Sequence, residues 1–321
     1  MDFRTDILLP QVKRLSQKIY LPCLLLVLAL VSCRSQRVDW EKVISWPELK
    51  ANDEFEFVEQ KELQNMNLKE ISGVAAGSTN PNFIYAIEDS FNANRVYILG
   101  SQGQYLGDLK LKNYKNYDWE DIAIGPGPEL GKSYIYVADI GDNYRVMNAV
   151  IIYRFKEPDL TKVKMPIDTV IRKIDRLRFQ YPDKRYNAET ILLDPLTKDL
   201  YIITKGTTAR IYKAPYSKLK GGTMRLQYVG SIPIEQATGG SISADGSQIL
   251  IKDYKQVYYW KRNEATPIEE TLIGPPTLVS YRKEIQGESI GWTNNGKGYF
   301  TISEREKRER EKPMLNFYRR N

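Results

Sequence analysis

The hydrophobic and polar positions of this chain follow a short pattern that returns five times. In each copy a small or acidic residue precedes a short apolar run, and the third residue stands at 74, 122, 191, 242 and 290. Successive copies lie roughly 50 to 70 residues apart, which is near the period of propeller blades. The copies are Ser72-Gly73-Val74-Ala75, Glu120-Asp121-Ile122-Ala123, Glu189-Thr190-Ile191-Leu192, Gly240-Ser241-Ile242-Ser243 and Glu288-Ser289-Ile290-Gly291.

Each copy is followed by a turn rich in Asn, Pro, Asp or Gly and then by two further apolar runs. Both runs are rich in β-branched and aromatic residues, which favour strands. The first set covers 83–87, 134–138, 200–203, 248–251 and 299–302. The second set covers 95–99, 150–154, 210–213, 256–260 and 315–318. Short strands and turns in a repeating order predict an all-β repeat protein.

A fourth, outer strand is predicted in four of the units, at 105–111, 171–179, 225–232 and 270–273. The last unit lacks one, and the alternating stretch at 54–60 can supply it. Propellers close their ring in this way, because an unpaired strand edge promotes aggregation. The sequence therefore predicts a five-bladed β-propeller closed by an N-terminal strand. The longest spacing, between the copies at 122 and 191, is explained by a loop insertion near 156–168, and a sixth blade is the alternative explanation. A β-sandwich is the other fold considered.

The N-terminus has the features of an export signal. Basic residues precede the apolar run at 24–30, which is too short to span a bilayer and ends in Leu30-Val31-Ser32-Cys33. This tetrad resembles the bacterial lipobox, in which the cysteine receives lipid and becomes the first mature residue. We expect a signal peptide at 1–32, a tether at 33–53 and the propeller at 54–321. The resemblance implies a membrane-anchored lipoprotein of the bacterial cell envelope, with the outer membrane as its expected location; an ordinary signal peptide or an uncleaved anchor is the alternative.

Composition excludes several kinds of chemistry. The chain has no histidine, and its two cysteines are Cys23, in the leader, and Cys33. A Ser-His-Asp triad, a Cys-His dyad and a histidine-ligated zinc site therefore cannot form. The formal net charge of +7 is mild for the length and gives little support to nucleic-acid binding, so no nucleic-acid partner is expected.

Three sequence segments resemble those of a family of bacterial propeller lipoproteins and secreted proteins. They are Asp118-Trp119-Glu120-Asp121-Ile122-Ala123, Val137-Ala138-Asp139-Ile140-Gly141-Asp142-Asn143 and Gln286-Gly287-Glu288-Ser289-Ile290. More distantly, the repeats look like those of SdiA-regulated, NHL-type and esterase-like phytase propellers. The resemblance covers about 65–320 and implies the propeller fold and export, without a settled substrate. Blades one and four depart from it, with Ser72 and Gly240 where a glutamate would stand.

The candidate site is the mouth of the central channel. The first strand of each blade lines this channel, so aligned copies of the pattern bring Glu120, Glu189 and Glu288 together around the axis. Like charges in a narrow site need a cation, a basic side chain or raised pKa values. In one interpretation the glutamates bind a hard cation such as Ca²⁺, or bind a polar ligand. In the other they cap backbone amides or pair with lysines such as Lys205.

A second polar cluster follows the next strand of each blade. Its members include Asp89, Asp139, Asp142, Lys205 and Glu304. The segment from Asp139 to Asn143 is acidic and rich in turn formers, but it lacks the spacing of an EF-hand loop. Metal binding there and simple turn formation are both open. The candidate ligand-binding residues are thus Glu120, Glu189, Glu288, Asp89, Asp139, Lys205 and Glu304, and the candidate metal ligands are Glu120, Glu189, Glu288, Asp139 and Asp142.

The predicted function is that of a lipid-anchored envelope propeller that binds a small-molecule or protein ligand at its channel mouth. A metal-dependent hydrolase acting on a phosphoester, ester or lactone is the alternative, with the glutamates as ion ligands or general base. A purely structural interaction module is a third class. The fold alone does not choose among them.

Overall fold

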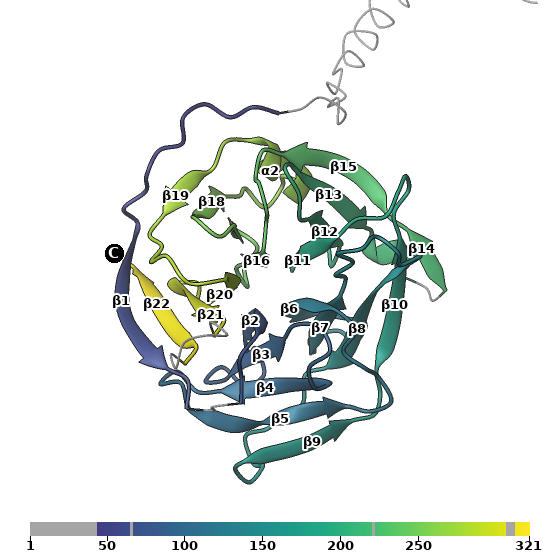
Figure 1. Ribbon diagram of the computed structural model, residues 1–321, viewed down its shortest axis with the longest axis vertical. Coiled ribbons are helices and arrows are strands. Elements are labelled where there is room, and N and C mark those ends of the chain that lie inside the picture. Colours follow the sequence, from purple (N-terminus) through teal and green to yellow (C-terminus); the bar gives the residue numbers. More distant parts are fainter. Residues whose placement is uncertain (1–43, 65–66, 220–221, 306–311) are drawn as a thin grey trace, which may run out of the picture. The chain divides into compact units, whose positions relative to one another are not determined.

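The computed structural model describes residues 44–64, 67–219, 222–305 and 312–321. Within these ranges the chain forms five sheets, in which most neighbouring strands are antiparallel. The sheets are placed radially around one axis, as Figure 1 shows. The inner strands β2, β6, β11, β16 and β20 surround the centre, and each contacts the inner strand of the next blade. The fold is the predicted five-bladed β-propeller, and the described residues hold no sixth blade.

The first two blades contain five strands each. Blade one comprises β2 (Ile71–Ala76), β3 (Ile84–Glu88), β4 (Arg95–Leu99), β5 (Tyr105–Leu111) and β9 (Ile167–Ile171). Blade two comprises β6 (Trp119–Pro126), β7 (Ser133–Asp139), β8 (Val150–Lys156), β10 (Asp175–Gln180) and β14 (Thr223–Arg225).

The other three blades contain four strands each. Blade three comprises β11 (Ala188–Leu193), β12 (Leu200–Thr204), β13 (Ala209–Ala214) and β15 (Gln227–Ile232), with a 3₁₀ turn η1 (Tyr216–Lys218). Blade four comprises β16 (Gly239–Ile242), β17 (Gln248–Lys252), β18 (Val257–Lys261) and β19 (Thr277–Val279), with helix α2 (Ile268–Ile273). Blade five comprises β20 (Gly287–Trp292), β21 (Gly298–Ser303), β22 (Met314–Arg320) and β1 (Phe55–Glu62).

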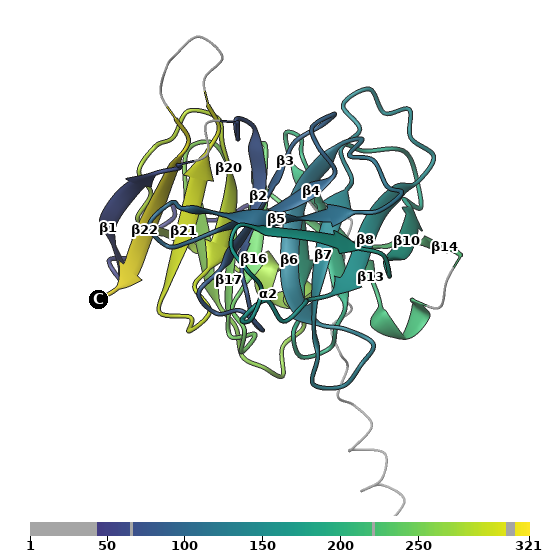
Figure 2. The ribbon, with the colours of Figure 1, turned by 90° about the horizontal axis from the view of Figure 1, so that it is seen from below.

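The ring closes through β1, as predicted. β1 pairs antiparallel with β22, the last strand of the chain, from Phe55 opposite Arg320 to Glu62 opposite Met314. Figure 2 shows the two strands side by side at the outer edge of blade five. The pairing removes the strand edge that β22 would otherwise expose to solvent.

Three predictions for the outer strands are corrected by the structure. The long step between blades two and three contains β9, which pairs in parallel with β5 and so extends blade one. The predicted strand at 225–232 is divided: β14 extends blade two by pairing with β10, and β15 completes blade three. The segment at 270–273 lies in helix α2, and the outer strand of blade four is β19.

The hydrophobic core lies between the blades. Five clusters of buried side chains each draw from two adjacent blades, so every interface between neighbouring sheets is filled. Ile98 of blade one and Ile135 of blade two share one such cluster, for example. Alternate residues of each strand point to opposite faces of the sheet, and both faces are covered, which explains why the strands read as continuous apolar runs.

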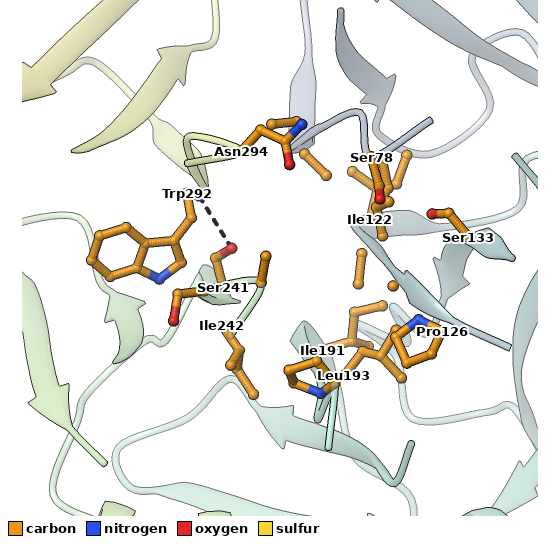
Figure 3. Close-up of a pocket in the computed structure, with 18 of the residues that line it drawn as sticks. Ser78, Ile122, Pro126, Ser133, Ile191, Leu193, Ser241, Ile242, Trp292 and Asn294 are labelled. Carbon is orange, nitrogen blue, oxygen red and sulfur yellow. Dashed lines mark hydrogen bonds between the residues drawn. The ribbon is translucent and has the colours of Figure 1, made fainter. Parts of the chain in front are cut away.

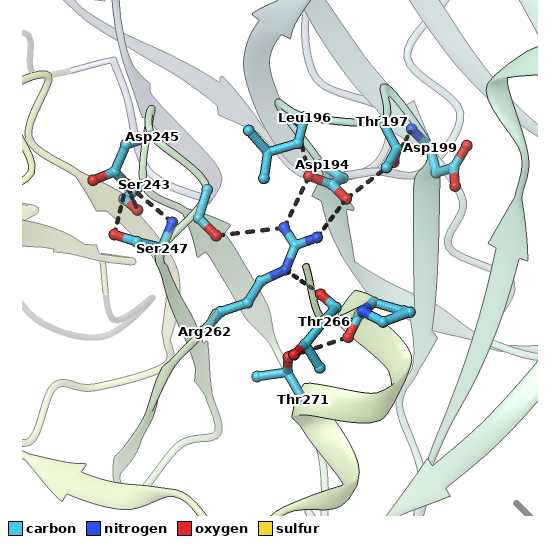
Figure 4. A network of polar contacts seen from close by, with 12 residues as sticks. Asp194, Leu196, Thr197, Asp199, Ser243, Asp245, Ser247, Arg262, Thr266 and Thr271 are labelled. Carbon is cyan, nitrogen blue, oxygen red and sulfur yellow. Dashed lines mark hydrogen bonds and ion pairs between the residues drawn. The ribbon is translucent and has the colours of Figure 1, made fainter. Parts of the chain in front are cut away.

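A buried ion pair joins blades three and four, between Asp194, just after β11, and Arg262, just after β18. Both Arg262 side-chain terminal nitrogens donate to the two Asp194 carboxylate oxygens at 3.0 Å, and the two side chains are 2% and 1% exposed. Arg262 Nε also donates to the Thr266 carbonyl at 2.7 Å (Figure 4). Every charge of the pair thus has a directional partner, as a buried ion pair requires.

The segment from residue 44 to 53 contacts blade four. Trp46 donates its indole N–H to the Ile273 carbonyl at 3.0 Å and packs against Tyr258 and Trp260. Ala51 forms an isolated parallel bridge with Leu278. The predicted signal peptide at 1–32 and Cys33 lie outside the described residues. Among the described helices, none has the length and apolar character needed to cross a membrane.

Candidate functional site

Four of the five inner strands carry a β-bulge at the first residue of the repeated pattern. In each case the residues on either side pair with the neighbouring strand, and the residue between them has no partner. These four residues are Ser72, Glu120, Glu189 and Glu288. A bulge bends the strand and re-aims the side chain of the extra residue, and bulges are frequent beside functional sites.

Blade four lacks this bulge, which corrects the sequence alignment. Gly240 pairs directly with Ile251, so it occupies the position after the bulge rather than the position of the glutamates. A Cβ at Gly240 would lie 2.8 Å from Thr190 Cγ2 and 2.9 Å from Leu192 Cδ2. A side chain at Gly240 would therefore have to displace these two side chains of blade three.

The three predicted glutamates meet at the axis. One carboxylate oxygen from each of Glu120, Glu189 and Glu288 lies within 4.8 Å of those of the other two. The residues are only 3%, 4% and 7% exposed. We call this site the acidic mouth, and define it by the three glutamates together with Asp89, Asp118 and Glu304.

One lysine partly compensates the charge of the acidic mouth. Lys205 Nζ lies 2.5 Å from Glu189 Oε1 and 3.7 Å from Glu288 Oε1. It also donates to the Tyr254 hydroxyl at 2.8 Å, and that hydroxyl donates to Glu288 Oε1 at 2.5 Å. Burial acts to lower the pKa of Lys205, but Glu189 and Glu288 outweigh it and raise the pKa. The lysine pairing considered from the sequence is thus present for two of the glutamates.

The compensation is incomplete. Glu189 Oε2 is buried and has no hydrogen-bond partner, and no ion pair within the described ranges reaches Glu120. Burial, followed by the charge of Glu189, raises the pKa of Glu120 well above its usual value. Burial and the charge of Glu288 likewise raise the pKa of Glu189 to about 8, despite Lys205. Ionised carboxylates here need a further positive charge.

A second group of converging oxygens adjoins the first. Asp89, Asp118 and Glu120 each place one carboxylate oxygen within 4.8 Å of the other two, so Glu120 belongs to both groups. Burial, followed by the charge of Asp89, raises the pKa of Asp118 to about 6. Asp118 and Tyr254 were not among the residues predicted from the sequence. Asp118 stands two positions before Glu120, and this strand-like spacing is the signal that identifies it.

Glu304 stands at the rim of the acidic mouth, just after β21. Burial, followed by the charge of Glu288, raises its pKa to about 9. The carboxyl of Glu304 is therefore protonated at neutral pH unless a cation approaches. The structure thus gathers six of the predicted site residues: Glu120, Glu189, Glu288, Lys205, Asp89 and Glu304.

Asp139 and Asp142 have different environments. Asp139 accepts hydrogen bonds from the Asp118 backbone at 2.9 Å and the Tyr153 hydroxyl at 3.2 Å. The Asp142 carboxylate accepts bonds from the backbone nitrogens of Val146 and Met147 at 2.8 and 2.9 Å. Neither belongs to the converging oxygen groups of the described residues. Both carboxylates hold loops in place, which is the turn-forming role considered from the sequence.

A cavity of about 300 Å³ lies at the opposite mouth of the channel, where the inner strands end. Figure 3 shows Ile122, Ile191 and Leu193 on one side of it and Trp292 and Ser241 on the other. Its lining is mainly apolar with several hydroxyl groups. The sequence pattern did not predict this cavity, because it is formed by residues from all five blades.

No protein-family model matches the chain, and no curated protein matches it either. Among solved structures, the chain is similar to one described as the Dos1 propeller, with 9% identity, a TM-score of 0.37 and coverage of 78% of this chain and 68% of that one. It is also similar to a chain in a nidogen/laminin complex, with 14% identity, a TM-score of 0.41 and coverage of 75% and 74%. The resemblance of the motifs to bacterial propeller lipoproteins stays a prediction, whereas the β-propeller fold is shown.

Proposed function

We propose that the acidic mouth binds a divalent cation, with Ca²⁺ as the expected ion, and that the bound cation holds a polar ligand or partner at the channel mouth. The observation that carries this proposal is the meeting of Glu120, Glu189 and Glu288 at the axis, with one Glu189 oxygen buried and unpartnered. Ca²⁺ takes six to eight oxygen ligands in flexible geometry, at about 2.3–2.6 Å. The oxygens of Asp89 and Asp118 extend the available set.

The charge of the acidic mouth favours a cation over a structural role alone. Lys205 contributes one positive charge against three buried glutamates, and its contacts reach Glu189 and Glu288. Glu120 is left with carboxylates on both sides, because it belongs to both oxygen groups. A buried carboxylate in such surroundings either takes a proton or coordinates a cation.

A metal-dependent hydrolase remains the second candidate. The observation that favours it is the place of Glu304 beside Glu288, where burial and the charge of Glu288 raise the pKa of the Glu304 carboxyl to about 9 when no cation is bound. A protonated carboxyl at a reacting centre can donate its proton to the leaving oxygen of a phosphoester, an ester or a lactone. Hydrolysis of such substrates that falls when Glu304→Gln is introduced would support this candidate over simple binding.

The proposal includes attachment to the cell envelope through lipid on Cys33. The tetrad Leu30-Val31-Ser32-Cys33 carries this part. A lipid on the first mature residue would hold the propeller near a membrane, where a channel mouth can meet envelope components.

Thermal unfolding with Ca²⁺ and with a chelator tests the cation site. A cation that binds only the folded state stabilises it by about 2.7 kcal/mol at 100 times its dissociation constant. We expect this gain in the parent and its loss in the triple variant Glu120→Gln, Glu189→Gln, Glu288→Gln. The matched control is Glu235→Gln, Glu264→Gln, Glu270→Gln, which changes three exposed glutamates and should keep the gain.

The single variant Glu120→Gln gives a second test, because it leaves the partners of Lys205 intact. It should reduce the Ca²⁺-dependent rise in melting temperature without leaving a buried lysine unpaired. An equal response to Ca²⁺ in the parent, in Glu120→Gln and in the triple variant would rule out ion binding by these residues.

A further inference from the structure

A basic groove opens on the same face as the acidic mouth. It has a volume of about 510 Å³ and is lined by Arg145, Lys205 and Arg210, together with hydroxyl and amide groups that include Thr207 and Gln236. No acidic side chain is among its lining residues. The groove lies beside the acidic mouth because Thr204, at the end of β12, pairs with Ala188, at the start of β11.

The Arg210 guanidinium is held in a defined plane. It stacks over the Tyr228 ring, with its central carbon 4.2 Å from the ring centroid. Its Nε donates to the Tyr212 hydroxyl at 3.0 Å, and one terminal nitrogen lies 3.5 Å from Asp183 Oδ2. The stacking and the Nε hydrogen bond fix the orientation of the guanidinium group. Its N–H donors are therefore suited to recognise a planar or tetrahedral anion.

Arg145 reaches the groove from a braced loop of blade two. Its backbone nitrogen donates to the Asp142 carbonyl at 2.9 Å, and the Asp142 carboxylate holds the two residues that follow. Arg145 adopts a φ of 55°, in the left-handed region that residues with side chains rarely occupy. The side chain is exposed and, among the described residues, has no ion-pair partner. Strained backbone positions cluster at ligand sites, and this one presents an arginine to the groove.

We propose that the basic groove binds an oxyanion group of the ligand, which is either a phosphate or a carboxylate. Arg145 and Arg210 would supply charge-assisted hydrogen bonds from two adjacent blades, with Thr207 and Gln236 as neutral donors. Lys205 lines the groove and also contacts the acidic mouth. One ligand can therefore place its anionic group in the groove and a second polar group at the cation site. This last link rests on the proposed function, whereas anion binding by the groove does not.

Titration of inorganic phosphate and of acetate, in the presence of chelator and at constant ionic strength, tests the groove without the cation. We expect saturable binding in calorimetry, about tenfold weaker in Arg145→Gln, since the loss of about 1.4 kcal/mol is a factor of ten. The control Arg178→Gln removes an exposed arginine that lies outside the groove and should bind as the parent does. Preference for phosphate or for acetate identifies which oxyanion the groove takes.

Arg210→Gln provides a second variant, and its melting temperature shows whether the loss of the Tyr228 stacking also unfolds the protein. Glu120→Gln should retain phosphate binding even if it loses the response to Ca²⁺, so failure of the cation site and failure of the groove are distinguishable. The proposal would be overturned if titration of phosphate and acetate released no more heat than titration of sodium chloride. Equal affinities of the parent and Arg145→Gln would overturn it as well.

Discussion

The Oδ2 atom of Asp121, in blade two, accepts a hydrogen bond from the backbone nitrogen of Ile191, in blade three, at 2.9 Å. The other carboxylate oxygen accepts a bond from the backbone nitrogen of Ile122 at 2.8 Å. Asp121 is 1% exposed and directly follows the bulged Glu120. Asp121, the residue after the axial Glu120, thus joins the inner strands of blades two and three.

Replacing Asp121 with alanine should destabilise the propeller by about 3 kcal/mol. The change leaves the buried Ile191 N–H without an acceptor, and a buried unsatisfied group costs about 1–3 kcal/mol before the smaller packing loss is added. Urea unfolding measures the free energy of unfolding of Asp121→Ala and of a control, Asp168→Ala. The Asp168 side chain is 82% exposed. Equal free energies of unfolding for the two variants would contradict the role given to Asp121.

The Asp194–Arg262 pair predicts strong coupling between two substitutions. Arg262→Met should cost about 3–5 kcal/mol, because it leaves the Asp194 carboxylate buried without its partner. The double variant Asp194→Leu, Arg262→Met should recover most of this loss, since it removes both buried charges. A double-mutant cycle measures the coupling, with the exposed Lys156–Glu129 pair as a control expected to show little coupling. Additive effects at Asp194 and Arg262 would refute the prediction.

The same pair predicts a dependence on pH. Burial acts to raise the pKa of Asp194, but the hydrogen bonds and charge of Arg262 outweigh it, so the folded-state pKa lies below 3.8. The unfolded state therefore binds more protons in this range, and stability falls as the pH falls. Between about pH 5 and pH 2, unfolding free energies should drop more steeply in the parent than in Asp194→Asn. Parallel curves for the two proteins would contradict the assignment.

Removal of the closing strand should expose the edge of β22. A chain that begins at residue 63 lacks all of β1 and loses the burial of Phe55, which packs against Tyr259, Trp292 and Tyr299. We expect self-association in sedimentation and a lower melting temperature, because an unpaired strand edge and an apolar face are both uncovered. A chain that begins at residue 44 is the control. Monomeric behaviour with an unchanged melting temperature in the shorter chain would show that β1 does not close the ring.

The variant Cys33→Ser tests the lipid anchor. Without the thiol the lipid has no attachment point, so the variant should accumulate at precursor mass and carry no acyl chains. Mass spectrometry of the parent should find acyl chains on Cys33. A Cys33→Ser protein that is still processed and still partitions into detergent would remove the basis of the lipoprotein proposal.

The sequence by itself predicted the fold class and the closing strand, and it favoured five blades while a sixth stayed open. These depend on strand periodicity and turn residues, which are local properties that repeat in register. The same repetition brought Glu120, Glu189 and Glu288 to one place, because equivalent positions on inner strands share one mouth of a channel.

Only the tertiary structure decided what surrounds those glutamates. The missing bulge at Gly240 and the approach of Thr190 depend on how neighbouring blades pack, and no residue pattern within β16 reveals them. The short strands β9 and β14 join blades other than the ones that precede them, since their partners are set by long-range pairing. The basic groove likewise combines Arg145 with Arg210 from different blades. Strand propensity is local, whereas the pairing of edges and the meeting of side chains are settled by the packing of the whole ring.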